Sequence, residues 1–322
     1  MKHHNQALLV EKLPAYLAHL HAEIKNDKGG EVASYIPELA KVDPETFAIS
    51  VRLMNGSVVS VGNSAAEFSL QSISKPFVYS LALAELGPER VHQSVGVEPT
   101  GNSFNSIVEL EEKSHLPYNP LINSGAIAIS SLIPGQSFEE RVEKIRSFLS
   151  NCAGRSLSIN ETIFASEKLT AHRNRAIANL MRYFNVLADP IEESLDIYFK
   201  QCSLQLNCED LATMAATLAN NGVNPLSHAR ILPSSHLQSV LSLMFTCGMY
   251  DSAGEWAFNV GIPAKSGVCG GIIGVVPGIM GISVYSPRLD SKGHSVRGLE
   301  VFKRMSKDLG LSLFAMGNGE NL

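Results

Sequence analysis

The sequence lacks the features that mark several large functional classes. Its 322 residues carry a net charge of −5 and contain no basic block, which argues against nucleic acid as the main partner. It has no glycine-rich phosphate loop, no H-E-x-x-H motif and no Cys/His cluster with metal-ligand spacing. The sequence therefore gives no signal for a nucleotide site or a metal site.

An export signal and a disulfide pattern are missing as well. The N-terminal apolar stretch is too short for a signal peptide and is interrupted by Glu11. The five cysteines are odd in number and form no C-x-x-C pair, so we expect reduced thiols in a cytoplasmic protein. They are Cys152, Cys202, Cys208, Cys247 and Cys269.

Charged residues are absent from residues 266–287, a stretch long enough to cross a membrane. However, the stretch holds six glycines, and Pro277-Gly278 in its middle is a turn signal. We therefore predict two buried strands joined by a hairpin, and no membrane partner.

The features that are present predict an α+β fold. Hydrophobic residues make up 45% of the chain and charged residues 18%, an ordinary globular balance. Two strand-like runs, 47–53 and 57–61, flank the hairpin signal Asn55-Gly56, and strand signals return at 255–286. Amphipathic helices are predicted at 5–24 and 296–309. We expect an antiparallel sheet built from both ends of the chain, with flanking helices and a helical insert.

The insert is predicted to be helical from 126 to about 243, after a loop region at 95–125. Ser137-x-x-Glu140 and Ser158-x-x-Glu161 match capping boxes, and Asp189-Pro190 matches a helix start. Further helices are predicted at about 209–221 and 235–248. Residues 1–322 are expected to form one domain, with a sheet subdomain at about 28–75 and 250–322 and a helical subdomain at about 76–249.

Ser72-Ile73-Ser74-Lys75 is an S-x-x-K motif at the start of an apolar helical run. Residues three apart share a helix face, so the amine of Lys75 can meet and activate the hydroxyl of Ser72. Pro76 is tolerated only in the first helical turn, which predicts that the helix begins at Ser72 and runs to Leu86. By itself the motif is weak, because roughly one or two such matches are expected by chance in this chain.

Lys265-Ser266-Gly267 begins the glycine-rich segment. A serine hydrolase of the S-x-x-K type needs such a triplet opposite its nucleophile. The lysine supplies positive charge, the hydroxyl binds substrate and the glycine lets the backbone approach closely. A strand start with a solvated lysine is the alternative for the isolated triplet.

Taken together, these motifs resemble the serine-dependent glutaminases of the bacterial type, which are relatives of the β-lactamase and penicillin-binding fold. The resemblance extends from about Gly30 to the end of the chain. It is carried by residues 35–40, 71–75, 119–127, 166–167, 173–174, 198–199, 202–203, 214–220, 247–251 and 263–268.

The resemblance implies hydrolysis of L-glutamine to L-glutamate and ammonia, without a metal or organic cofactor. Ser72 would be the nucleophile, Lys75 its base and Tyr250 a member of the proton relay. The N–H groups of Ser72 and Val268 would form the oxyanion hole, supported by Lys265, Ser266 and Gly267. The positions that match the family's substrate-binding residues are Tyr35, Asn123, Glu167, Asn174 and Tyr198.

The resemblance also implies a homotetramer or a homodimer. The chain departs from the family where Ser-Gly-Asp-Arg-Asn is usual, since it has Thr170-Ala171-His172-Arg173-Asn174. Three alternatives remain at this stage: a β-lactamase or peptidoglycan-processing enzyme on the same fold, a non-catalytic glutamine sensor, and a structural α+β protein.

Overall fold

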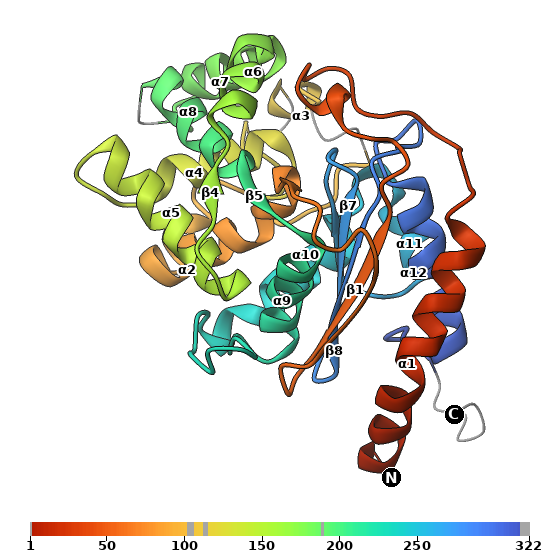
Figure 1. Cartoon of the computed structure of the whole chain (residues 1–322). Helices are drawn as coiled ribbons and strands as arrows, with labels where there is room; N and C mark the ends of the chain where they lie inside the picture. Colours follow the sequence, from red (N-terminus) through yellow and green to blue (C-terminus); the bar gives the residue numbers. More distant parts are fainter. Residues whose placement is uncertain (1, 102–105, 112–114, 188–189, 316–322) are drawn as a thin grey trace.

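The computed structural model describes residues 2–101, 106–111, 115–187 and 190–315. Its main sheet has five antiparallel strands in the order β2-β1-β8-β7-β6. Strand β1, from near the N-terminus, pairs along its length with β8, so the sheet is assembled from both ends of the chain as predicted (Figure 1). The strands are β1 Ala48–Leu53, β2 Val58–Gly62, β6 Ala264–Ser266, β7 Gly271–Val276 and β8 Met280–Tyr285.

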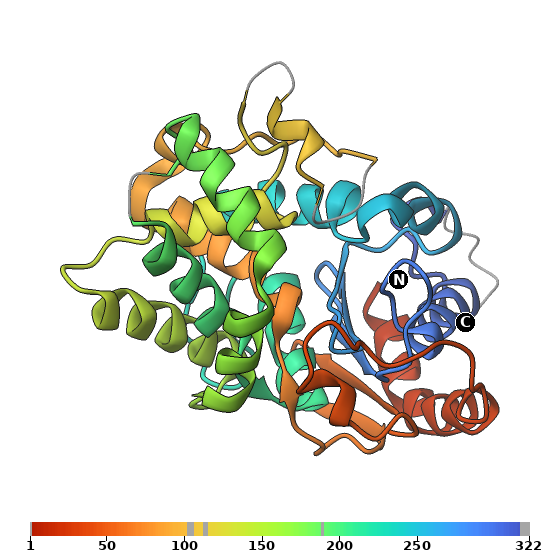
Figure 2. The ribbon, with the colours of Figure 1, turned by 90° about the horizontal axis from the view of Figure 1, so that it is seen from above.

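Helices cover both faces of this sheet (Figures 1 and 2). Helices α1 (Lys2–Ile24) and α12 (Val296–Leu309) pack on one face, and α9 (Cys208–Ala219) packs on the other. In β7, Ile272 belongs to the core under α12, whereas Ile273 belongs to the core under α9. This alternation follows from the two-residue period of a strand. The prediction of terminal amphipathic helices is confirmed.

The charge-free segment forms β7 and β8, joined by a tight turn at Pro277-Gly278. Gly278 has a φ of +72°, and Val276 lies opposite Met280. The hairpin prediction is therefore confirmed. None of the helices in the described ranges is long and apolar enough to cross a membrane.

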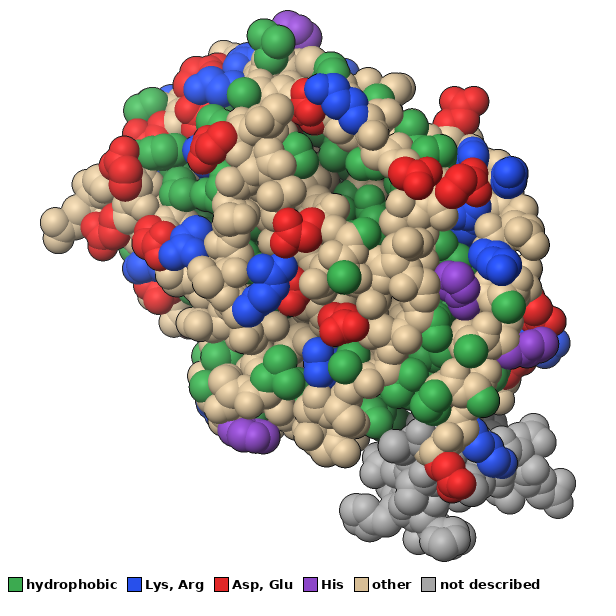
Figure 3. All heavy atoms as spheres, in the orientation of Figure 1, with side chains coloured by type: hydrophobic (Ala, Val, Ile, Leu, Met, Phe, Trp, Pro, Cys, Tyr) green, Lys and Arg blue, Asp and Glu red, His purple; other side chains and the backbone are tan. Residues whose placement is uncertain are grey.

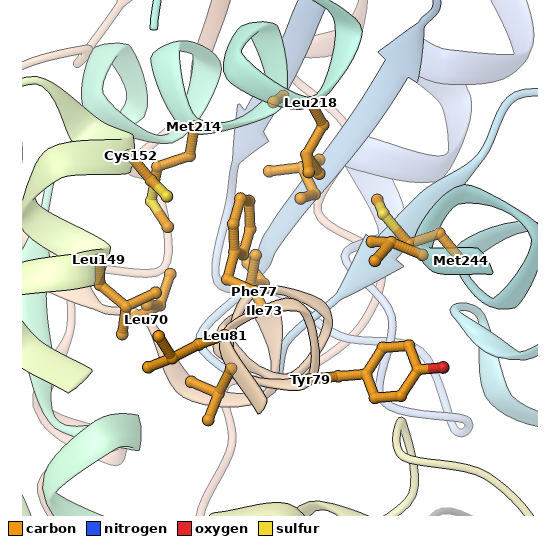
Figure 4. Packing of buried hydrophobic residues seen from close by; sticks show 14 of the residues in the cluster. Leu70, Ile73, Phe77, Tyr79, Leu81, Leu149, Cys152, Met214, Leu218 and Met244 are labelled. Carbon is orange, nitrogen blue, oxygen red and sulfur yellow. The ribbon is translucent and has the colours of Figure 1, made fainter. Parts of the chain in front are cut away.

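Most of the remaining helices form a separate layer beside the sheet. They are α2 Lys75–Val91, α3 Val108–Glu111, α4 Asn123–Leu132, α5 Phe138–Ala153, α6 Glu161–Thr170, α7 His172–Tyr183, α8 Ile191–Cys202 and α10 Ser234–Cys247. Figure 4 shows Ile73 and Phe77 pointing toward Met214 and Leu218 of α9. Each of these side chains is buried, which stabilises the fold by about 1.5–3 kcal/mol per large apolar residue. The start of α2 is thereby fixed between the two layers.

Several element predictions were wrong, each for a local reason. The segment predicted to return to strand at 255 begins with a helix, α11 (Ala253–Asn259), whose buried Trp256 donates a hydrogen bond to the carbonyl of Ile262 at 2.7 Å. Ser158 is no cap, because it lies in a strand of a small second sheet; the side chain of Asn160 caps α6 instead. This sheet contains β3 Phe68–Ser69, β5 Leu204–Leu206 and β4 Ser158–Ile159.

Other boundary predictions had mixed outcomes. Ser137 accepts a hydrogen bond from the Glu140 N–H at 3.2 Å, and Gly154 ends α5 in the left-handed conformation, as predicted. Pro190 precedes α8 as its cap residue, while Asp189 lies outside the described residues. The helix predicted to end at Leu86 bends at Gly87, where φ is +77°, and continues to Val91.

The face of the molecule shown in Figure 3 carries acidic and basic side chains that are interspersed with hydrophobic ones. It shows no large basic area. This distribution agrees with the modest negative charge of the chain.

Candidate active site

Ser72 lies in a buried 3₁₀ turn, Gln71–Ser74, which leads directly into α2. The prediction that the α-helix begins at Ser72 was therefore wrong by one turn. Gln71 has a φ of +50°, a left-handed conformation that is uncommon for a residue with a side chain. The Ser74 hydroxyl donates to the Gln71 carbonyl at 2.8 Å and accepts from the amide of Gln201 at 2.8 Å. These bonds brace the turn that contains Ser72.

A small cavity of about 110 Å³ opens in front of Ser72. It brings together six of the residues predicted from the sequence, each from a different loop, turn or helix. The six are Tyr35, Ser72, Asn123, Glu167, Asn174 and Tyr198. The volume is below the roughly 300 Å³ of a typical drug-sized site, so the cavity fits a small molecule better than a polymer.

Asn123, the first residue of α4, connects Lys75 to this cavity. Its side-chain oxygen accepts from the Lys75 amine at 2.6 Å and from the Tyr198 hydroxyl at 3.3 Å, and its amide donates to Asn174 at 2.9 Å. Lys75 is only 1% exposed, and burial lowers its pKa to about 8. A neutral asparagine can hold the amine without a counter-charge that would keep it protonated.

Glu167, in α6, is the acidic side chain of the cavity. Burial raises its pKa to about 8, although the Gln71 side chain and the charge of Lys75 oppose the rise. Its Oε2 atom is buried without a hydrogen-bond partner among the described residues. An unpartnered buried carboxylate oxygen is costly, which makes it a natural acceptor for a cationic group of a ligand.

Two tyrosines close the cavity. Tyr198 is buried, and burial raises the pKa of its phenol well above the usual range. The side chain of Tyr35 is 54% exposed, and it lines the cavity together with Glu167. Ile36, next to Tyr35, packs in a small core with Val268, which anchors this segment over the site.

Tyr250, Lys265 and Ser266 form a second wall next to Ser72. The Tyr250 hydroxyl donates to the Ser266 carbonyl at 3.2 Å, and the Lys265 amine donates to the same carbonyl at 2.7 Å. Burial raises the pKa of Tyr250, while a hydrogen bond with Ser72 opposes that rise. Burial, followed by the charge of Lys75, holds the pKa of Lys265 well below its usual value. Both lysines are thus buried, desolvated amines.

The backbone next to Ser72 approaches closely because Gly267 has no side chain. A Cβ atom there would lie 3.0 Å from Cγ1 of Ile73, the residue after Ser72. Among the backbone hydrogen bonds of the described residues, none uses the N–H of Ser72 or of Val268. The two N–H groups predicted to form the oxyanion hole are therefore available as donors.

The sequence prediction missed two residues of this region. Gln71 lines the cavity and bonds to Glu167, and its place directly before the S-x-x-K motif was the available signal. His294 contacts the Ser266 hydroxyl through Nδ1 at 2.8 Å, so this hydroxyl faces a histidine outside the cavity lining. No motif in the sequence points to His294, since only the fold brings it next to Ser266.

The unusual Thr170–Asn174 segment forms a one-residue junction between α6 and α7. Ala171 caps both helices with a φ of −75°, which any residue can adopt, so no glycine is needed there. The side chain of His172 is exposed, whereas Ala171 and Asn174 line the cavity. Of the two residues that depart from the usual Gly-Asp, Ala171 therefore faces the cavity and His172 faces away from it.

A larger hollow of about 210 Å³ is lined in part by Val268, Ser69 and Tyr285. It does not include Ser72 in its lining, so we assign the candidate active site to the smaller cavity. Within the described ranges, no group of three or more His, Cys, Asp or Glu side chains is arranged to hold a metal ion.

Comparison with solved structures defines the class of fold. The structure superposes on a probable glutaminase, ybaS, with a TM-score of 0.92 and 40% identity, covering 95% of this chain and 99% of that one. It also superposes on a protein named Mglu, solved in its glutamate form, with a TM-score of 0.91 and 41% identity, covering 95% of this chain and 71% of that one. The fold is therefore the β-lactamase-like fold of the bacterial glutaminases.

Sequence comparison then identifies the family. The family model described as Glutaminase matches residues 30–314. A curated glutaminase from Nostoc sp. (strain PCC 7120) is 52% identical over 304 residues, which cover 94% of this chain and 91% of the relative. This chain belongs to the glutaminase family. The resemblance inferred from the sequence is confirmed.

Proposed function

We propose that this glutaminase hydrolyses L-glutamine to L-glutamate and ammonia through a γ-glutamyl ester on Ser72. The single observation that carries the residue assignment is the cavity in which Ser72 lies together with Asn123, Glu167 and Tyr198. The overall reaction follows from membership of the family. A β-lactamase or a peptidoglycan-processing enzyme is not favoured, since the relatives described above are glutaminases and the cavity is small.

In the first step, Ser72 Oγ attacks the side-chain carbonyl carbon of glutamine. Lys75 takes the hydroxyl proton when its amine is neutral, which its burial and its uncharged partner Asn123 both favour. Tyr250, which hydrogen-bonds to Ser72, passes a proton to the leaving nitrogen and takes back the proton held by Lys75, so that the proton of Ser72 leaves with the ammonia. The C–N bond breaks, ammonia leaves and the γ-glutamyl ester remains on Ser72.

The N–H groups of Ser72 and Val268 are proposed to bind the oxyanion that develops in this step. Losing one such donor typically raises the barrier by about 3 kcal/mol. The Lys265 amine donates to the Ser266 carbonyl and lies 3.9 Å from the centroid of the Tyr250 ring, so it holds both groups beside the reacting atoms. In the second step, water attacks the ester, a proton returns to Ser72 and L-glutamate is released.

The remaining residues are proposed to hold the amino-acid end of glutamine. The unpartnered oxygen of Glu167 suits the ammonium group. Asn174 and Tyr35 offer neutral donors to the carboxylate, and they add no cation that would repel the ammonium. Tyr198, whose hydroxyl donates to Asn123, is proposed to hold the Asn123 side chain in place beside the substrate. The glutamate form named for the related Mglu structure is consistent with a site of this kind.

The test is ammonia release from glutamine by the wild type and by Ser72→Ala, with asparagine as the substrate control. We expect glutamine hydrolysis by the wild type and its loss in the variant. An active Ser72→Ala variant would show that the serine mechanism is wrong. Turnover of nitrocefin by the wild type would instead favour the β-lactamase alternative.

We also propose a cytoplasmic location, a homotetrameric or homodimeric assembly, and a single catalytic unit formed by residues 1–322 from a sheet subdomain and a helical subdomain. The five free, buried cysteines support the location, and the family resemblance supports the assembly. Cell fractionation tests the first, and light scattering of the purified protein tests the second.

A further inference from the structure

His294 lies outside the cavity, in the connection between β8 and α12, and is fully buried. Its backbone is held on both sides. The Asp290 carboxylate accepts from the His294 N–H at 2.9 Å, and the Asp290 N–H donates to the His294 carbonyl at 2.8 Å. The next residue, Ser295, caps α12 and donates to the Ser286 carbonyl at 2.7 Å. The imidazole is therefore presented from a rigid turn.

The imidazole contacts two members of the wall beside Ser72. Its Nδ1 atom lies 2.8 Å from the Ser266 hydroxyl, and its ring stacks on the Tyr250 ring with centroids 5.5 Å apart and an interplanar angle of 19°. Ser266 is also the residue whose carbonyl accepts from both Tyr250 and Lys265. His294 thus contacts Ser266, the residue that joins Tyr250 to Lys265, although His294 does not line the cavity.

The His294 ring is neutral near pH 7, so it can hold its neighbours in place without adding a charge. Burial lowers the pKa of His294 to about 4, with Lys265 and Lys292 acting in the same direction and Asp290 and Asp251 opposing it. The Nε2 atom is buried with no partner in the described part of the chain. Leaving a lone pair unpaired costs less than leaving a buried N–H unpaired, so we place the proton on Nδ1. The ring then donates to Ser266 Oγ.

We infer that His294 is a positioning residue of the reaction: it fixes the Ser266 side chain and the Tyr250 ring, and through them the wall that serves Ser72. The inference rests on the proposed function, in which Tyr250 takes part in proton transfer. His294 itself touches neither Ser72 nor the groups proposed to bind the amino-acid end of glutamine. Its effect should therefore fall on kcat rather than on KM.

Two substitutions separate the two contacts. His294→Asn keeps a donor near the position of Nδ1 but removes the ring, whereas His294→Phe keeps a ring against Tyr250 but removes the hydrogen bond. His294→Ala removes both. We expect kcat for glutamine to fall about 10-fold in the Ala variant, and less in each of the other two, with KM unchanged within about 2-fold.

His21 provides the matched control. It is also a partly buried histidine stacked on an aromatic ring, Phe47, with centroids 4.5 Å apart, and it contacts the Phe47 carbonyl at 3.2 Å. It lies in α1, which packs on the sheet face opposite α9. His21→Asn should leave kcat and KM unchanged, even where it lowers the melting temperature.

The kinetic constants are measured on protein whose folding is verified by circular dichroism. A folded His294→Ala variant with wild-type kcat would overturn the inference, and so would a rise in KM at constant kcat. An equal loss of kcat in His21→Asn would also overturn it, since the effect would then be general destabilisation. Activity in Ser72→Ala would overturn the serine mechanism. The kcat values of the three His294 variants would still show, independently, whether His294 positions Ser266 and Tyr250.

Discussion

Lys75 and Glu167 are the two buried ionisable residues on which the account depends at the residue scale. Burial moves both pKa values to about 8, from opposite directions, and the two charges also influence one another. Because they interact, the two protons belong to the pair rather than to either residue alone. The proposed chemistry needs the doubly deprotonated form, with a neutral amine to act as base and a carboxylate to bind the ammonium of glutamine.

This requirement predicts an acidic limb in the pH profile of kcat/KM. As the pH rises through about 8, the fraction of enzyme with neutral Lys75 and ionised Glu167 increases, so kcat/KM should rise with pH. Well below pH 8, kcat/KM should increase about 100-fold per pH unit, because two protons must be lost. The measurement is steady-state ammonia release from glutamine between about pH 6 and pH 9.

Glu167→Gln tests the second ionisation. The variant should lose at least about 30-fold in kcat/KM, since a buried charge partner of the ammonium is removed. Its acidic limb should fall to one decade per pH unit, because only Lys75 still has to lose a proton. A wild-type profile that is flat across this range would contradict the assignment of both residues.

Asn123→Asp changes the charge beside Lys75 with little change in shape. A carboxylate 2.6 Å from the amine, where the neutral oxygen now lies, favours the ammonium form and raises the pKa of Lys75. The acidic limb of kcat/KM should therefore move to higher pH. The control is Asn179→Asp on the exposed face of α7, which should leave the limb in place. An unshifted limb in Asn123→Asp would argue against Lys75 as the base.

At the scale of elements, the close packing of α9 on β8 holds the two layers together. Gly281 of β8 lies so close to α9 that a Cβ atom there would be 2.1 Å from the Ala216 nitrogen and 2.5 Å from the Ala212 oxygen. These are backbone atoms of a helix, which cannot move aside as a side chain can.

Gly281→Ala should therefore lower the free energy of unfolding by roughly 1–3 kcal/mol, as overpacking typically does. Urea denaturation of the purified protein measures it. The matched control is Gly254→Ala in α11, where no atom lies within 4 Å of the added Cβ. That variant should be as stable as the wild type, or more stable by up to about 1 kcal/mol. Equal stability of the two variants would contradict the packing argument.

Elements with a strong local signal were predictable from the sequence, and elements defined by tertiary contacts were not. The Asn55-Gly56 hairpin, the end of α5 at Gly154 and the span of α12 follow from turn and capping chemistry. The two-residue strand β4 exists because Ser158 and Ile159 pair with β5, about 45 residues further along the chain. The helical start at Ala253 was missed because α11 is only seven residues long and has Gly254 as its second residue, which weakens a helical signal.

At the scale of the whole molecule, the fold unites segments that are remote in the sequence. The cavity draws residues from position 35 to position 198, and its second wall comes from residues 250–268. Helical periodicity and motif spacing predicted that Ser72 and Lys75 act together. The other residues of the site, such as Asn123 and Glu167, were predicted only from the family resemblance. His294 was not predictable by either route, because its contacts with Ser266 and Tyr250 exist only in the folded chain.

Product binding should stabilise the whole molecule. L-glutamate that occupies the cavity binds only the folded state, so at about 100 times its Kd it should raise the free energy of unfolding by about 2.7 kcal/mol. A thermal melt with and without L-glutamate measures the shift. Glu167→Gln should abolish it and His21→Asn should retain it. An equal shift in both variants would place glutamate binding elsewhere.

The central claim is that Ser72 carries the γ-glutamyl group during turnover. The most direct test mixes the enzyme with glutamine, stops the reaction with acid within the first turnover and measures the mass of the intact protein and of its peptides. The account predicts a gain of one glutamyl group, located on the peptide that contains Ser72 and absent from Ser72→Ala. Glutamine turnover with no such adduct in the wild type, together with activity in Ser72→Ala, would contradict it.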